Sequence, residues 1–104
     1  MRPELIEAVW LHGRVMPEAD PEHWRQDACG AWMRREQFGR EDTDFGWKIE
    51  SVVPGGAQTA DALRPFHWRN GYDLANGSLR RSVTADRSSV PAEKSVSPPR
   101  NRSL

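Results

Sequence analysis

Cysteine and long apolar runs are both scarce in this sequence. The single cysteine, Cys29, excludes an intramolecular disulfide framework and a zinc site built on paired cysteines. No apolar run approaches the length of a membrane-spanning helix, and the N-terminus lacks the apolar stretch of a signal peptide. We therefore expect a cytoplasmic protein without a membrane partner.

Aromatic residues are missing from the C-terminal quarter of the chain. Every Trp, Phe and Tyr falls between Trp10 and Tyr72, whereas residues 77–104 hold seven Ser and three Pro. Such a composition buries too little apolar surface to offset the entropy of ordering the chain. The sequence therefore predicts a small domain at residues 1–76 and a disordered, basic Ser- and Pro-containing tail at 77–104.

The formal net charge of zero conceals an uneven distribution. Residues 1–76 carry nine basic and thirteen acidic side chains, a net charge of −4, and residues 77–104 carry a net charge of +4. One interpretation of the tail is a solvated extension without a role. The other is weak, salt-sensitive contact with nucleic-acid phosphates or with the acidic face of the domain itself.

Helical and extended signals alternate through the first half of the chain. A short helix is expected at residues 3–11, with Pro3 in its first turn and Gly13 after its end. Asp20 followed by a proline predicts a second helical turn. A short strand at residues 31–33 and a single helical turn ending at Gly39 come next. Cys29 between them is interpreted as a small buried residue.

The densest pattern lies at residues 46–71. Trp47 and Ile49 alternate with Lys48 and Glu50, which predicts a half-buried strand ending near Pro54 and a Gly-Gly turn. A helix-compatible step and a second extended stretch at residues 63–68 follow. We expect Trp47 and Trp68 to be buried.

Several blocks, in this order, resemble a small bacterial branch of the HNH endonucleases, which are ββα-metal nucleases. The blocks are Cys29–Arg35, Phe38–Gly39, Gly46–Ile49, Val53–Gly56 and Leu63–Trp68. The resemblance spans roughly residues 10–76. It implies an α+β fold with a small ββα-metal core, short N-terminal helical turns and a flexible C-terminal tail.

The resemblance also implies positions for the chemistry, and the match departs from the family there. Glu50 stands where the family has a metal-binding Asp, and Ser51 stands where it has the general-base His. Ala62 replaces the Asn that orients this His, and Gly71 falls where a late ligand is expected. A serine hydroxyl is not basic at neutral pH, so hydrolysis would lack its base.

Two functions remain open. We favour a degenerate HNH endonuclease-like protein that has lost hydrolysis and needs no cofactor. Such a protein either acts by binding DNA or another nucleic acid or has no present activity. The alternative is an active metal-dependent DNA endonuclease with a rearranged site. Its divalent metal would be held by Glu50, His67 and Asn70, with Asp73 as a further candidate and Glu50 and His67 as the catalytic candidates.

Four arginines could face phosphates under this resemblance: Arg34, Arg35, Arg64 and Arg69. The alternative is that they are ordinary surface arginines on an acidic domain. With thirteen acidic residues in the same part of the chain, the sequence gives no strong electrostatic footprint for DNA.

Overall fold

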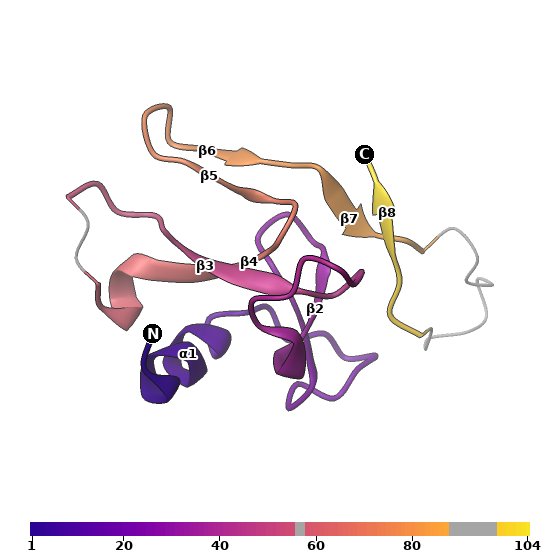
Figure 1. Cartoon of the computed structure of the whole chain (residues 1–104). Coiled ribbons are helices and arrows are strands. Elements are labelled where there is room, and N and C mark those ends of the chain that lie inside the picture. Colours follow the sequence, from indigo (N-terminus) through magenta and orange to yellow (C-terminus); the bar gives the residue numbers. More distant parts are fainter. Residues whose placement is uncertain (56–57, 88–97) are drawn as a thin grey trace.

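One α-helix and eight short strands make up the described part of the chain. The computed structural model describes residues 1–55, 58–87 and 98–104. The elements are α1 (Pro3–Trp10), β1 (Trp24–Gln26), β2 (Trp32–Arg34), the 3-10 turn η1 (Arg35–Gln37), β3 (Trp47–Ser51), the 3-10 turn η2 (Ala60–Ala62), β4 (Leu63–His67), β5 (Gly71–Asp73), β6 (Ser78–Arg80), β7 (Val83–Ala85) and β8 (Asn101–Ser103) (Figure 1).

The strands pair as four separate antiparallel ribbons rather than as one sheet. The pairs among the described residues are β1–β2, β3–β4, β5–β6 and β7–β8. A two-stranded ribbon is marginally stable by itself in water. Each ribbon therefore depends on the surfaces and side chains that join it to its neighbours.

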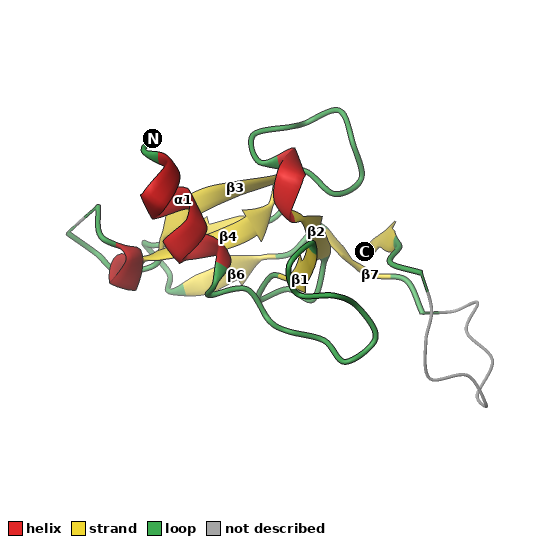
Figure 2. Cartoon of the chain, turned by 90° about the horizontal axis from the view of Figure 1, so that it is seen from below, coloured by secondary structure: helices red, strands yellow, loops and turns green. Residues whose placement is uncertain are grey.

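The helix α1 covers one face of the β3–β4 ribbon, and the β5–β6 ribbon lies on the opposite side (Figures 1 and 2). The helix forms as expected, because Pro3 occupies its first turn and Glu4 lies at its positive end. Val9 and Trp10 near its end are buried. Burial of this face holds a helix that would be too short to persist alone.

The hydrophobic core is an aromatic cluster between α1 and the β3–β4 ribbon. Trp10, Met33 and Trp47 are its buried members. The Trp47 ring lies 5.2 Å from that of Trp10 and 4.8 Å from that of Phe38. Trp47 is fully buried, which confirms the prediction for this residue, whereas Trp68 is only half-buried.

The central ribbon matches the expected strand and turn. Trp47 pairs with His67 and Ser51 pairs with Leu63 across the ribbon. The helix-compatible step before β4 is the 3-10 turn η2. The predicted Gly-Gly turn at residues 55–56 lies partly outside the described residues, because residues 56 and 57 are not described.

The predicted ββα-metal core is wrong, because the chain forms another hairpin where the helix should begin. Asp73 on β5 accepts the backbone N–H groups of Ala75 and Asn76, and its other carboxylate oxygen accepts the Asn76 side chain. Gly77 then takes a left-handed conformation with φ of 62°. This Asp and Asn-Gly chemistry favours a chain reversal over a helix. A small α+β fold remains.

Two local predictions in the first half need adjustment. Asp20 caps a turn by accepting the N–H of Glu22, but the chain then enters the unexpected strand β1 instead of a helix. The expected strand at residues 31–33 is present one residue later as β2, and the helical turn before Gly39 is η1.

The range 77–104 also differs from the expected disordered tail where it is described. It contains β6, β7 and β8, and Val83 on β7 is buried. Residues 88–97 lie outside the described residues.

Two asparagines attach this range to the domain. Buried Asn70 accepts the N–H groups of Ser82 and Val83 through its Oδ1. Asn101 accepts the N–H of Trp32 and donates to the carbonyl of the same residue, as a neighbouring strand would. These contacts need little apolar surface, which is why composition did not reveal them.

Candidate functional site

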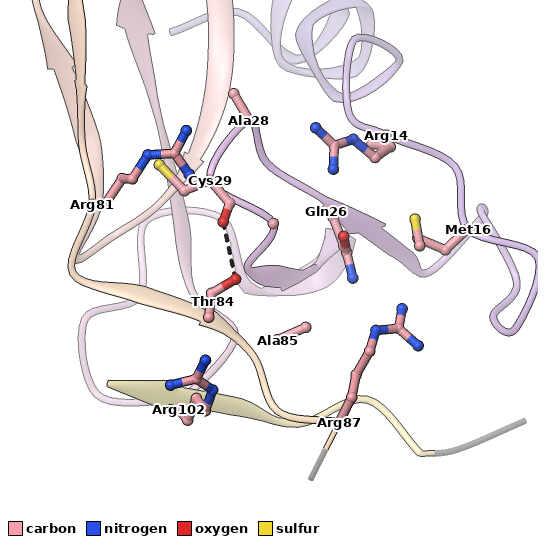
Figure 3. A pocket seen from close by; sticks show the side chains of 11 residues that line it. Arg14, Met16, Gln26, Ala28, Cys29, Arg81, Thr84, Ala85, Arg87 and Arg102 are labelled. Atoms are coloured by element: carbon pink, nitrogen blue, oxygen red, sulfur yellow. Dashed lines mark hydrogen bonds between the residues drawn. The ribbon is translucent and has the colours of Figure 1, made fainter. Parts of the chain in front are cut away.

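A cavity of about 950 Å³ lies where the C-terminal ribbon meets the β1–β2 turn (Figure 3). Four arginines line it: Arg14, Arg81, Arg87 and Arg102. They come from four separate segments of the chain. None of the described residues that line this cavity is acidic.

Backbone contacts bring the four segments together. Arg14 pairs with Gln26 in a short β-bridge beside β1. Thr84 on β7 donates its hydroxyl to the carbonyl of Cys29, and the N–H of Ala85 donates to the carbonyl of Gly30. These bonds dock the β7–β8 ribbon, and Arg102 with it, against the β1–β2 turn. The cavity is therefore a product of tertiary docking.

The charge of the cavity is only partly neutralised within the molecule. Arg87 forms an ion pair with Glu18, whose side chain is nearly buried. For Arg14, Arg81 and Arg102, no ion-pair partner is found within the described part of the chain. Guanidinium groups present rigid forks of N–H donors that match phosphate and carboxylate oxygens. The cavity is suited to an anion.

A buried amide adds an unused donor to the same cavity. Gln26 is 3% exposed, and its Nε2 is the only buried side-chain nitrogen or oxygen among the described residues that lacks a hydrogen-bond partner. Its side chain lies between Arg14 and Arg87 in Figure 3. An unsatisfied buried donor costs about 1–3 kcal/mol. A ligand oxygen at this position would satisfy it.

The thiol of Cys29 also borders the cavity but is not a nucleophile there. Burial and the negative charge of Asp27 raise its pKa to about 11, against the opposing effect of Arg81. The thiol is therefore protonated at neutral pH. Cys29 is 4% exposed, which confirms its interpretation as a small buried residue.

A second cavity, of about 340 Å³, shares a wall with the first. The two have Arg14, Gln26 and Ala28 in common. The second is lined further by apolar and aromatic residues of the ribbons, by a histidine and by an arginine, namely Val52, Pro65, Phe66, Tyr72, Leu79, His12 and Arg64. A charged cavity thus adjoins a largely apolar one.

Glu50, the predicted metal ligand on β3, is engaged by other groups. It accepts the N–H of Tyr72 and forms ion pairs with Lys48 and Arg80. Burial alone would raise its pKa, but these contacts together lower the pKa below its ordinary value. Glu50 is therefore a carboxylate at neutral pH, held by cations of its own chain.

His67 and Asn70 lie together, around the buried carboxylate of Asp27. The backbone N–H of His67 and the side-chain amide of Asn70 both donate to Asp27 Oδ2. The His67 ring has both nitrogens occupied, since Nε2 lies 2.8 Å from the Asp44 carbonyl and Nδ1 accepts the N–H of Arg69. Burial lowers the pKa of His67, so the ring is neutral at pH 7. This geometry makes His67 and Asn70 parts of a hydrogen-bond network.

Glu50 is not brought to these two residues. Glu50 pairs with Arg64 across the ribbon, and Arg64 lies three positions, about 10 Å, from His67 along β4. Because side chains alternate along a strand, this odd spacing places the Glu50 and His67 side chains on opposite faces of the ribbon. Among the residues described, no group of three or more His, Cys, Asp or Glu side chains could hold a metal ion. Asp73 binds its own turn instead.

The four arginines proposed from the sequence are engaged by different partners. Arg34 stacks over Trp24 at 5.0 Å, and Arg35 pairs with Glu7 and Glu22. Arg69 donates to the Ser103 hydroxyl. Only Arg64 borders one of the two adjoining cavities, through the second.

The sequence reasoning missed Arg14, Arg81, Arg87 and Arg102 because they belong to no common motif. One signal was available. Three of the four fall in the range 77–104, whose net charge of +4 was already evident. What the composition did not show is that this range docks on the domain and places its cations around one cavity.

No protein-family model, curated protein or solved structure matches this chain. Nothing in these comparisons identifies the HNH endonuclease family. Within residues 1–55, 58–87 and 98–104, no helix combines the length and the apolar character that crossing a membrane requires. The functional argument therefore starts from the geometry of the two cavities.

Proposed function

We propose that this protein binds nucleic acid, with the phosphates of one strand held in the arginine-lined cavity. The observation that carries the proposal is the convergence of Arg14, Arg81, Arg87 and Arg102 on one cavity that also holds the unpaired Gln26 amide. At about 950 Å³ the cavity is far larger than a single phosphate needs and lies at the upper end of ligand-site volumes. Several linked phosphates suit it better than one.

The four arginines of this cavity also explain how a chain with a formal net charge of zero could bind phosphates. Net charge governs long-range attraction, but contact with phosphates depends on the local field and on donors in place. Several acidic side chains of the domain are held in ion pairs with Arg35, Lys48 and Arg40 elsewhere, and Glu18 is the acidic residue that pairs with an arginine of this cavity. Binding would therefore be local and strongly salt-dependent.

Hydrolysis is not part of this proposal. The residues at the positions named by the HNH resemblance do not converge, because Glu50 and His67 lie on opposite faces of the β3–β4 ribbon. The Cys29 thiol is protonated at neutral pH. The arrangement of the arginine-lined cavity supports binding of phosphates, with no described base or nucleophile beside them.

The test is fluorescence anisotropy of a labelled single-stranded DNA of about 12 nucleotides, a length within the site sizes of single-strand binders. With three or four phosphate contacts, the slope of log K against log salt should be about −2 to −3. Arg81→Ala/Arg102→Ala should lower affinity at least about tenfold and reduce the slope by about 1.4.

The matched control is Arg2→Ala/Arg40→Ala, which removes the same charge away from the cavity. Arg2 precedes α1, and Arg40 pairs with exposed Asp42. An equal loss in both double variants would contradict a defined site. So would displacement of the DNA by poly-glutamate at the same concentration of charge, which would indicate an acidic protein partner instead.

A further inference from the structure

We infer that the second cavity receives an unstacked base of the bound strand, so that the ligand is single-stranded. This inference rests on the proposed function, because it assigns the phosphates to the arginine-lined cavity. It adds the chemical class of the neighbouring group. The observation behind it is that a cavity with apolar and aromatic walls shares Arg14, Gln26 and Ala28 with the cationic one.

The walls of the second cavity suit a planar heterocycle. Buried Pro65 and Phe66 of β4 line it, and so do half-buried Tyr72 and Leu79, which are cross-strand partners in the β5–β6 ribbon. The volume of about 340 Å³ equals that of about eleven water molecules in the liquid. This space is of the order of one ring system and is too small for a folded partner. Bases stack on aromatic side chains regardless of sequence, since every base has a π-face.

The polar groups of the second cavity also suit a nucleotide. Asp27, the one acidic residue in its lining, already accepts four hydrogen bonds from Cys29, Ala31, His67 and Asn70. Its acceptor positions are thereby filled. His12 and Arg64 at the edge can instead contact the flanking phosphate. A base therefore meets an apolar interior with nitrogen donors at its border.

The shared wall connects the two parts of the ligand. Arg14 and Ala28 are exposed, so a sugar–phosphate chain can pass over them. Gln26 between them carries the buried Nε2 that lacks a partner. A sugar or phosphate oxygen at this junction would accept its N–H. One nucleotide would then place its base in the apolar cavity and its backbone against the buried amide, while the neighbouring phosphates of the strand reach the arginines.

A paired base does not reach such a cavity without being extruded, because bases in a duplex are stacked and paired. The structure therefore favours single strands over duplexes of equal length. A phosphate–sugar chain without bases would keep the arginine contacts and lose only the base contact. This difference separates the inference from the proposed function.

The experiment compares ligands on the full-length wild-type protein, by competition against the labelled strand. The intact single strand should bind roughly 5- to 100-fold more tightly than a fully abasic strand of equal length, and more tightly than a duplex. Equal binding of intact and abasic strands would overturn the base pocket while leaving phosphate binding intact. Absence of binding by any strand at low salt would instead overturn the proposed function.

A substitution that fills the second cavity supplies a second test of the inference. Val52 lines only the second of the two cavities, and Val53 beside it is 44% exposed and lines neither. Val52→Trp should reduce the affinity for the intact strand to that for the abasic strand, whereas Val53→Trp should leave it unchanged. Equal affinity for the strand in both variants, with circular dichroism showing both folded, would overturn the base pocket.

A free nucleoside monophosphate forms the last arm, because it carries the same base and phosphate. It should compete far more weakly than the strand, since it fills only part of the arginine-lined cavity. Competition with the affinity of the strand would show that the ligand is a small nucleotide and would overturn the assignment to single-stranded nucleic acid.

Discussion

The two parts of this molecule are held by different forces. In residues 1–76, large aromatic side chains pack on one another, with Trp10 and Phe38 each in contact with Trp47. In the described part of 77–104, Val83 is the buried hydrophobic residue, and attachment depends on the amides of Asn70 and Asn101. The comparison teaches that a segment without an apolar core of its own can be ordered by side chains that substitute for strand partners.

The proposed binding site lies where these two parts meet. Gln26 belongs to residues 1–76, which the aromatic core holds. Arg81, Arg87 and Arg102 belong to residues 77–104, whose described part is attached by hydrogen bonds. Hydrogen-bonded attachment is weaker than core packing, since each bond contributes about 0.5–1.5 kcal/mol net. Changes to the asparagines should therefore disturb the cavity before they unfold the domain.

The largest expected loss of stability follows from a substitution in the aromatic core of residues 1–76. Trp47→Ala removes a fully buried ring and its Nε1 bond to the Arg35 carbonyl. It should lower the free energy of unfolding by about 3–5 kcal/mol, measured by urea denaturation. Trp68→Ala, at a half-buried position, is the control and should cost less. A loss below about 1 kcal/mol at Trp47 would contradict the assignment of the core.

Asn70→Ala should produce the next largest loss, about 2–4 kcal/mol. The substitution leaves the N–H groups of Ser82 and Val83 without their acceptor and removes a donor from Asp27. Asn76→Ala, at an exposed turn, provides the comparison and should cost well under half as much. Equal losses in the two variants would mean that Asn70 does not join the two parts.

Asn101→Ala should cost about 1–2 kcal/mol, because the side chain is only partly buried. Its expected signature is local: the amide N–H of Trp32, which loses its acceptor, should exchange faster with solvent. NMR hydrogen exchange measures this. Ser103→Ala on the same strand, at an exposed position, should leave that rate unchanged. Unaltered exchange in Asn101→Ala would indicate that β8 is held by other contacts.

The smallest effect concerns pH and His67, which lies between the two parts. Burial lowers its pKa in the folded state below the ordinary value of 6.5, so the unfolded chain binds more protons just below pH 6.5. Stability from the neutral ring is present above pH 6.5 and is lost as pH falls toward the folded pKa. Thermal melting at pH 7.5 and 5.5 should show this loss in wild type and a smaller one in His67→Gln.

His12→Gln is the control for that measurement, because His12 is exposed and makes no side-chain bond among the described residues. Its melting temperature should depend on pH as the wild type does. If His67→Gln retained the full wild-type dependence, other groups would be responsible for it.

Local sequence patterns predicted the first half of the chain well where one signal dominated. Pro3 and Glu4 marked α1, and the alternation at Trp47–Glu50 marked β3. The prediction was wrong at residues 70–77, where the resemblance suggested a helix. There the Asp73, Asn76 and Gly77 turn formed a hairpin instead. The turn chemistry was readable, but it was outweighed by the resemblance.

The candidate site was beyond such patterns. Arg14 and Arg102 are 88 positions apart, and no spacing rule relates them. The metal-site hypothesis met the converse difficulty. It joined Glu50 to His67 through a motif, while the pairing of β3 with β4 places them on opposite faces.

The sequence by itself determined the aromatic core, the first helix, the central strand and the concentration of positive charge after residue 76. These follow from local periodicity and composition, which act over a few residues. Tertiary structure alone decided where that charge lies. Docking of β7–β8 on the β1–β2 turn depends on hydrogen bonds between distant residues, such as Thr84 with Cys29 and Asn101 with Trp32. Hydrogen-bond partners that are far apart in sequence leave no periodic trace, so only the folded chain shows the cavity they create.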